Sequence, residues 1–220
     1  MIEFKDFKKG FGGELLFDIE HLVLRERIYW LIGANGVGKT TLLKSIAGLI
    51  PFTGDILVDE INIRKEKMKF RLLVNYAEAE PVYPEFLSGQ DLLNLYGNSK
   101  KAFSGQVTYL VNKFQIDGYL KKMAGTFSSG MAKKLSLVLA FIGNPKLILL
   151  DEPFISLDKQ AIEHVQQLIS EYFDLGTSFL ISSHQDLKIN HNLMATSLEV
   201  KNTAIIASTY AYAKNIQHGI

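Results

Sequence analysis

The segment GANGVGKT, residues 33–40, has the residue types and spacing of a phosphate-binding loop, G-x-x-x-x-G-K-[ST]. Glycines let successive backbone N–H groups point inward around phosphate oxygens, and the start of a following helix adds partial positive charge. Lys39 would reach the β- and γ-phosphates, and the Thr40 hydroxyl would ligate Mg²⁺. The loop is therefore predicted to hold a nucleoside triphosphate. The residues predicted to contact it are Gly33, Asn35, Gly36, Gly38, Lys39, Thr40 and Thr41.

A pair of carboxylates, Asp151 and Glu152, follows the apolar run Leu147–Leu150. Such a run is typical of a strand buried on both faces, and in an open α/β sheet the carboxyl ends of the strands face the ligand crevice. Asp151 is predicted to bind Mg²⁺, usually through water. Glu152 is predicted to lie near the γ-phosphate, where it could accept a proton from attacking water. An ordinary glycine-rich turn and a solvated acid pair are the structural alternatives.

Strands and helices that alternate along the chain must position these two segments. Strands are predicted at Ile2–Phe7, Leu22–Leu24, Ile28–Ile32, Gly54–Val58, Leu72–Tyr76, Leu147–Leu150 and Ser178–Ser182. Helices are predicted from Lys39 to about Gly48 and at Ser88–Tyr96, Gly105–Phe114, Ser129–Ile142 and Ala161–Phe173. The alternation implies a parallel sheet, into which a helical block at about residues 81–144 is inserted as a subdomain. The basic run Arg64–Arg71 is interpreted as a solvated connector, and the tail from about Ser208 as poorly fixed.

Composition limits the class of protein. The 220 residues, 47% of them apolar, suit a single domain, residues 1–220, with a sizeable core. The net charge of +1 argues neither for nor against nucleic acid as a partner, and the absence of cysteine excludes disulfides and thiolate metal sites. Charges at positions 3, 5 and 6 stand where a signal peptide would need an apolar core, and the longest apolar runs are too short to span a bilayer.

Segments in a fixed order make the sequence resemble the nucleotide-binding subunit of an ATP-binding cassette (ABC) transporter. In KGFGG, Phe11 matches an aromatic that stacks on adenine in that family. The phosphate loop follows, and then FSSGM at residues 127–131, in which Ser128 and Gly130 match the family's signature while Ser129 and Met131 depart from it. The acid pair is followed by SLD at residues 156–158 and by SSH, which ends at His184.

The resemblance implies an α/β fold, with a P-loop NTPase RecA-like core around a parallel sheet, an N-terminal antiparallel β subdomain and the inserted α-helical subdomain. It implies ATP and Mg²⁺ as cofactors and Glu152 and His184 as catalytic residues. Ser128 and Gly130 would complete the ATP site of a second cassette, giving a homodimer or heterodimer around two ATP molecules. Asp158 would help communication across that interface.

The family couples this closure to a membrane permease, here supplied in trans. The implied location is cytoplasmic and peripheral, at the inner face of the cell membrane through the permease, with no nucleic acid as partner. Tyr83, Pro84 and Phe86 lie where the family docks its membrane subunit, although these side chains could equally pack within the helical subdomain.

The main departure is Ala79, which aligns with the loop glutamine that contacts Mg²⁺ and senses the γ-phosphate in the family. The hypothesis is that Ala79 weakens coupling between nucleotide state and subdomain rotation and leaves ATP binding intact. Glu78 or Glu80 could substitute if the register slips by one residue.

Three other readings of the sequence compete with a transport ATPase. A non-transport ABC ATPase acting on DNA or ribosomes is opposed by the lack of a coiled-coil insertion and of a basic stripe. A small P-loop kinase does not explain FSSGM or SSH. Ala79 favours a weakly hydrolysing nucleotide-dependent regulator, whereas the intact Glu152 argues against it.

Overall fold

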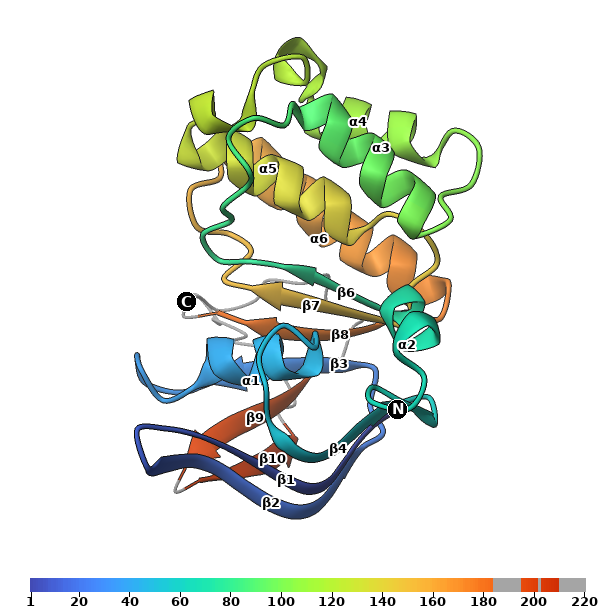
Figure 1. The fold of residues 1–220 in the computed structure, drawn as a ribbon. Coiled ribbons are helices and arrows are strands. Elements are labelled where there is room, and N and C mark those ends of the chain that lie inside the picture. The colour runs from blue at the N-terminus through green and yellow to red at the C-terminus, as the bar shows by residue number, and fades with distance from the viewer. Residues whose placement is uncertain (184–194, 202, 210–220) are drawn as a thin grey trace, which may run out of the picture.

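Two β-sheets and the helices between and above them make up the fold (Figure 1). The computed structural model describes residues 1–183, 195–201 and 203–209. The strands are β1 (Ile2–Phe11), β2 (Glu14–Leu24), β3 (Ile28–Ile32), β4 (Thr53–Val58), β5 (Ile61–Asn62), β6 (Val74–Ala77), β7 (Leu147–Asp151), β8 (Ser178–Ser182), β9 (Thr196–Lys201) and β10 (Ala204–Thr209). The helices are α1 (Lys39–Ile46), α2 (Lys67–Leu73), α3 (Gly89–Ser99), α4 (Gln106–Phe114), α5 (Ser129–Ala140) and α6 (Lys159–Asp174), with short 3-10 turns η1 (Asp117–Tyr119) and η2 (Ala124–Thr126).

The six-stranded sheet has the order β10-β9-β3-β8-β7-β6. Strands β9, β3, β8, β7 and β6 are parallel, and β10 is an antiparallel edge strand on β9. Every residue of β7 is buried, as its unbroken apolar run predicts. The parallel arrangement brings the carboxyl ends of β3, β8, β7 and β6 to one edge of the sheet.

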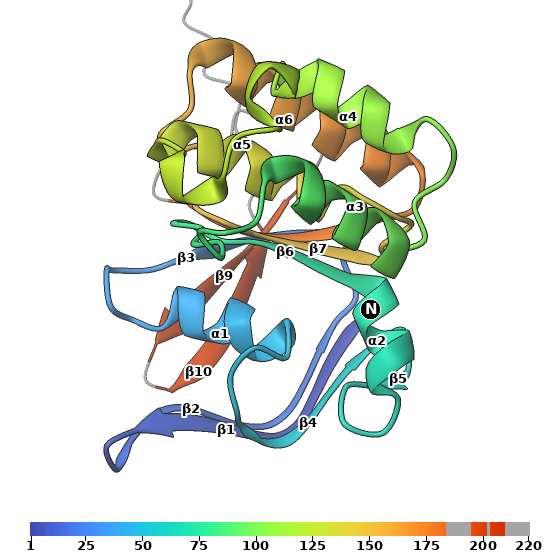
Figure 2. The ribbon, with the colours of Figure 1, turned by 45° about the horizontal axis from the view of Figure 1, so that its top comes forward.

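The six-stranded sheet separates two hydrophobic cores. Helices α3, α4, α5 and α6 cover one face, while α1 lies between the other face and the four-stranded antiparallel sheet β2-β1-β4-β5 (Figures 1 and 2). Successive residues of β7 serve the two sides: Ile148 and Leu150 belong to the core under the helices, and Leu147 and Leu149 to the core around α1. Both faces of the central strands are therefore sealed from water.

Several predicted boundaries differ from the structure. The prediction of a strand from Leu72 is wrong, because α2 continues through Leu73 and β6 begins only at Val74. Part of the basic run taken for a connector is helical, since its residues are mostly good helix formers and Phe70 anchors them in the core around α1.

Other strands are longer than predicted or were not predicted: β1 continues to Phe11 and not only to Phe7, and the short β5 was missed. Strand β2 runs from Glu14 and not from Leu22, and its alternation places Phe17 and Ile19 in the core. Strands β9 and β10 were missed, and β10 continues to Thr209, past the point where the tail was predicted to become poorly fixed. None of the helices in the described ranges is both long enough and apolar enough to cross a bilayer.

Candidate nucleotide site

The phosphate loop connects the end of β3 to the start of α1 and is closed from outside by β2. Gly38 has a φ of 109°, which side chains rarely adopt. A Cβ atom there would lie 2.8 Å from Leu16 Cδ2 and 3.1 Å from Phe17 Cε2. The antiparallel sheet therefore packs directly against the loop, and glycine is required at position 38 by both backbone angle and space.

Lys39 lies folded over this loop. Its side chain is 7% exposed, and its Nζ donates hydrogen bonds to the carbonyls of Gly33 (2.7 Å) and Ala34 (3.2 Å). The N-cap residue of α1 is Gly38, which has no side chain to cap the helix, and the first turn contains no acidic residue. The loop thus concentrates an ammonium group, the N-terminal end of a helix dipole and free space at Gly36, where an added Cβ would meet nothing within 4 Å.

The exposed members of the loop face solvent. Asn35, Gly36 and Thr40 are exposed, whereas Gly33 and Thr41 are half-buried. All of these predicted contact residues lie in the loop before α1 or in its first turn, so they are at the N-terminal end of the helix.

Asp151 ends β7 and is 1% exposed. Its Oδ1 accepts a hydrogen bond from Ser182 Oγ on β8 (2.6 Å), and its Oδ2 accepts one from Tyr76 OH on β6 (3.2 Å). Burial, together with the negative charges of Asp151 and Glu78, raises the pKa of Tyr76, so the phenol remains a donor. Both neighbouring strands thus fix the orientation of this carboxylate.

Glu152 turns the chain out of the sheet immediately after Asp151. It is a half-buried non-glycine residue with a φ of 44°, a conformation that costs about 1–3 kcal/mol. Its backbone N–H donates to both the carbonyl and the hydroxyl of Ser182, each at 3.1 Å. Strained backbone held in place by neighbouring groups is typical of functional sites.

A magnesium ion fits the chemistry of Asp151 and Thr40. Carboxylate and hydroxyl oxygens suit Mg²⁺, which in phosphate sites takes one or two protein ligands and completes its shell with water and phosphate. Each oxygen of Asp151 accepts a single hydrogen bond and keeps further acceptor capacity. Among the described residues no group of three or more His, Asp or Glu side chains could hold a metal ion.

The signature segment begins α5, on the opposite face of the six-stranded sheet from α1 (Figure 1). Ser128 caps this helix, and its exposed Oγ accepts a hydrogen bond from the Met131 N–H at 3.2 Å. A Cβ at Gly130 would lie 3.1 Å from the carbonyl oxygen of Ser156, so the signature packs tightly against SLD.

The SLD segment is tied to α5 by a second contact. Asp158 Oδ2 pairs with Lys134 Nζ at 2.7 Å, while Oδ1 accepts from the Ala161 N–H at 2.8 Å and caps α6. These two interactions lower the pKa of Asp158. The signature and Asp158 therefore form one connected surface, apart from the phosphate loop.

The family model for ABC transporters matches residues 16–155, which include the phosphate loop, the signature and the acid pair. The chain belongs to the ABC transporter family. The lantibiotic transport ATP-binding protein SrtF of Streptococcus pyogenes is 26% identical over 218 residues, covering 99% of this chain and 94% of the relative. The ABC-type transporter ATP-binding protein EcsA of Bacillus subtilis is 30% identical over 190 residues, covering 84% and 77%.

Solved structures agree with the fold. An ATP-binding subunit of an ABC transporter superposes with a TM-score of 0.83 at 26% identity, covering 94% of this chain and 89% of that one. A dimeric ATP-binding cassette bound to ADP and Pi superposes with a TM-score of 0.80 at 20% identity, covering 95% and 98%, and shows likeness of fold. The expected α/β P-loop NTPase fold is confirmed, and the chain is an ABC-type ATP-binding subunit.

In this ABC subunit the remaining predicted residues differ in how far they are exposed to solvent. Phe11 ends β1 and is 59% exposed, and Lys9 Nζ lies 4.1 Å from its ring centroid. Tyr83 packs against the core under the helices, whereas Phe86 is 78% exposed and Pro84 is also exposed. His184 lies outside the described residues.

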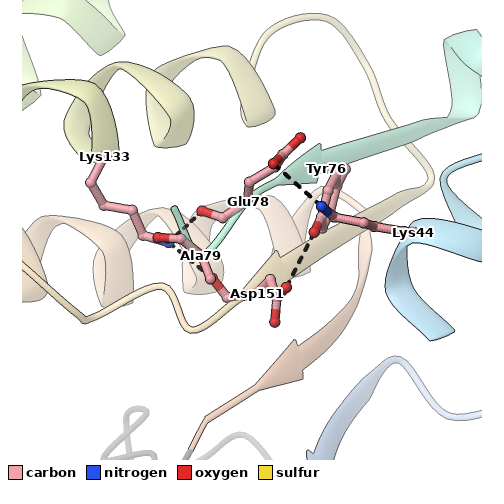
Figure 3. A network of polar contacts seen from close by, with 6 residues as sticks. All are labelled: Lys44, Tyr76, Glu78, Ala79, Lys133 and Asp151. Carbon is pink, nitrogen blue, oxygen red and sulfur yellow. Dashed lines mark hydrogen bonds and ion pairs between the residues drawn. The ribbon is translucent and has the colours of Figure 1, made fainter. Parts of the chain in front are cut away.

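Three residues near the ABC site were missed by the sequence analysis. Tyr76 and Ser182 orient the acid pair, and Lys133 lies 1% exposed beside the loop that holds Ala79 (Figure 3). The only local signal for Lys133 is its position just before the apolar stretch 135–142, which is typical of a helix buried on all sides.

Proposed function

We propose that this chain binds ATP with Mg²⁺, hydrolyses it in sites shared with a second cassette, and powers a membrane permease encoded by another chain. The observation that carries the proposal is the separation of the two halves of the site. The phosphate loop lies at the start of α1, and the Ser128 tip at the start of α5 lies across the six-stranded sheet (Figure 1). One chain then offers both halves, each to be completed by a partner.

Each residue has a defined task in this proposal. Lys39 and the loop N–H groups bind the β- and γ-phosphates, and Phe11 stacks on adenine. Asp151 and Thr40 hold Mg²⁺, which when bound would neutralise charge on the phosphate oxygens. Glu152 accepts a proton from the attacking water, and His184 contacts the γ-phosphate.

The second cassette supplies Ser128 and Gly130 to the γ-phosphate, and Asp158 lies at the interface. Closure is favoured because the γ-phosphate adds contacts on both faces, and hydrolysis removes those contacts. The helical block at about residues 81–144 transmits the change to the permease as a subdomain, at a cytoplasmic, membrane-peripheral location. The relatives named as transport ATP-binding proteins support this assignment.

The test uses Glu152→Gln, which removes the proton acceptor and keeps the shape of the side chain. With ATP and Mg²⁺, light scattering should detect a dimer for this variant while the native protein stays largely monomeric. Glu163→Gln, an exposed change on α6, is the matched control and should behave like the native protein. A Glu152→Gln protein that stays monomeric at saturating ATP would contradict the shared site, and co-purification of a multi-span membrane protein tests the permease.

A further inference from the structure

Lys133 is a buried lysine on the signature helix α5 that reaches into the nucleotide side of the fold. It is 1% exposed, and its Nζ donates to the carbonyl oxygens of Glu78 (2.6 Å), Ala79 (3.2 Å) and Asp151 (2.9 Å). An ammonium group has three donors, and all three are used here. Figure 3 shows the side chain extending from α5 to these two segments.

The carbonyl acceptors of Lys133 lie where strands β6 and β7 end. Strands β6 and β7 pair in parallel up to Ala77 and Leu150; β6 ends there, while β7 continues one residue further, to Asp151, paired with β8 alone. Lys133 joins the two segments just beyond the last pair, where no ladder connects them. It does so beside Asp151, whose carboxylate is the proposed magnesium ligand, and at Ala79, where the family's glutamine is absent.

Burying a charged group among backbone carbonyls has a cost, and burial lowers the pKa of Lys133 to about 8. Four nearby carboxylates offset that cost by their negative charge: Asp151, Glu152, Glu78 and Glu80. A side chain that served packing alone would be apolar at this site.

The other end of α5 is attached to β6, the strand that leads into residues 78–79. The Asn75 side chain on β6 donates to the carbonyl oxygens of Ala140 and Ile142, both at 2.8 Å. Hydrogen bonds from Lys133 therefore attach the end of α5 that carries Ser128, and hydrogen bonds from Asn75 attach the far end.

We propose that Lys133 is a positioning residue for ATP hydrolysis, which fixes the backbone of residues 78–79 and of Asp151 relative to the signature helix. This inference rests on the proposed hydrolysis. Lys133 thereby connects the phosphate site to the helical layer. The alanine side chain at position 79 makes no such connection, and Lys133 replaces it with a contact from the signature helix to the loop backbone.

The experiment compares Lys133→Met and Lys133→Gln with the control Lys100→Met in the full chain. Lys100 follows α3 and also donates to backbone carbonyls, those of Arg71 and Val74, but near the start of β6 and away from the acid pair. Both lysines are buried enough that their pKa is lowered to about 8. Lys100→Met therefore also removes a partly buried ammonium group, but it leaves the residues around the nucleotide site unchanged.

The measurements are kcat and KM for ATP by phosphate release, together with binding of a fluorescent ATP analogue. Lys133→Met should lower kcat about tenfold, equivalent to about 1.4 kcal/mol, with KM and analogue affinity changed less than about twofold. Lys133→Gln keeps two donors and should retain an intermediate kcat. Lys100→Met should leave kcat unchanged.

Three results would overturn the inference. They are a wild-type kcat in both Lys133 variants, an equal loss of kcat in Lys100→Met, and a rise in KM with unchanged kcat. If Lys133→Met does not fold, Lys133→Gln decides between a lowered and an unchanged kcat. Failure of the native protein to hydrolyse ATP would instead reject the proposed function, and the inference with it.

Discussion

Adding a single methyl group at Gly38 should destabilise the protein and disorganise the phosphate loop. Two costs combine in Gly38→Ala. The φ of 109° is unfavourable for alanine, and the new Cβ would lie 2.8 Å from Leu16 Cδ2, 3.0 Å from Leu16 Cγ and 3.1 Å from Phe17 Cε2. Since Leu16 and Phe17 belong to β2, the perturbation reports on how the antiparallel sheet supports the loop.

The magnitude follows from these two costs. A strained backbone conformation costs about 1–3 kcal/mol, and forcing an extra carbon into packed surroundings costs about another 1–3 kcal/mol. Gly38→Ala should therefore lose about 2–6 kcal/mol of unfolding free energy. Gly36→Ala is the matched control, because Gly36 has a φ of 80° but its added Cβ would meet nothing within 4 Å. Gly36→Ala should lose only the unfolding free energy that comes from the backbone conformation, about 1–3 kcal/mol.

The assay is urea unfolding of each variant without nucleotide, with constant m-values as the check on two-state behaviour. In the double variant Leu16→Ala/Gly38→Ala the nearest contacts are removed, so the two changes should be coupled by about 1 kcal/mol or more. Equal losses for Gly38→Ala and Gly36→Ala, with no coupling to Leu16, would refute the packing argument.

Two further predictions concern other parts of the molecule. Ala79→Gln should raise partner-stimulated ATPase activity about fivefold, because glutamine would supply the polar contact to Mg²⁺ and the γ-phosphate that alanine cannot make; no rise, or an equal rise in the exposed control Glu163→Gln on α6, would contradict this. Burial, and then the nearby Arg71, lower the pKa of Lys100 from 10.5 to about 8, so between these pH values the unfolded chain binds more protons than the native state. Stability relative to Lys100→Met should therefore rise with pH across that window in urea unfolding, and a flat or falling difference would refute the assignment.

Much of the fold follows from local pattern. The unbroken apolar run before Asp151 predicts a fully buried strand, and the structure buries every residue of β7. Strand β3, helix α5 and helix α6 were likewise expected, because apolar spacing acts within a few positions of the chain; the cap at Asp158 was missed, and α6 begins at Lys159 and not at the predicted Ala161. Strand β9 was missed because its short sequence becomes a strand through pairing with β3, which is distant in the chain, and β10 was missed with it because β10 pairs with β9.

The sequence by itself determined the phosphate loop and the acid pair, since both depend on a strand, a turn and the residues directly beside it. Only the tertiary structure decided how these groups are held. Leu16 and Phe17 of another sheet close around Gly38, and Ser182 and Tyr76 orient Asp151 from neighbouring strands.

Lys133 is the clearest case of a residue whose role only the tertiary structure decides. In the sequence it is one of two adjacent lysines on a helix, of the kind that usually faces solvent. In the structure its ammonium group meets carbonyl oxygens 54 and 55 positions away along the chain. A buried charge is tolerated only where distant backbone supplies its acceptors, and that condition cannot be read from neighbouring residues.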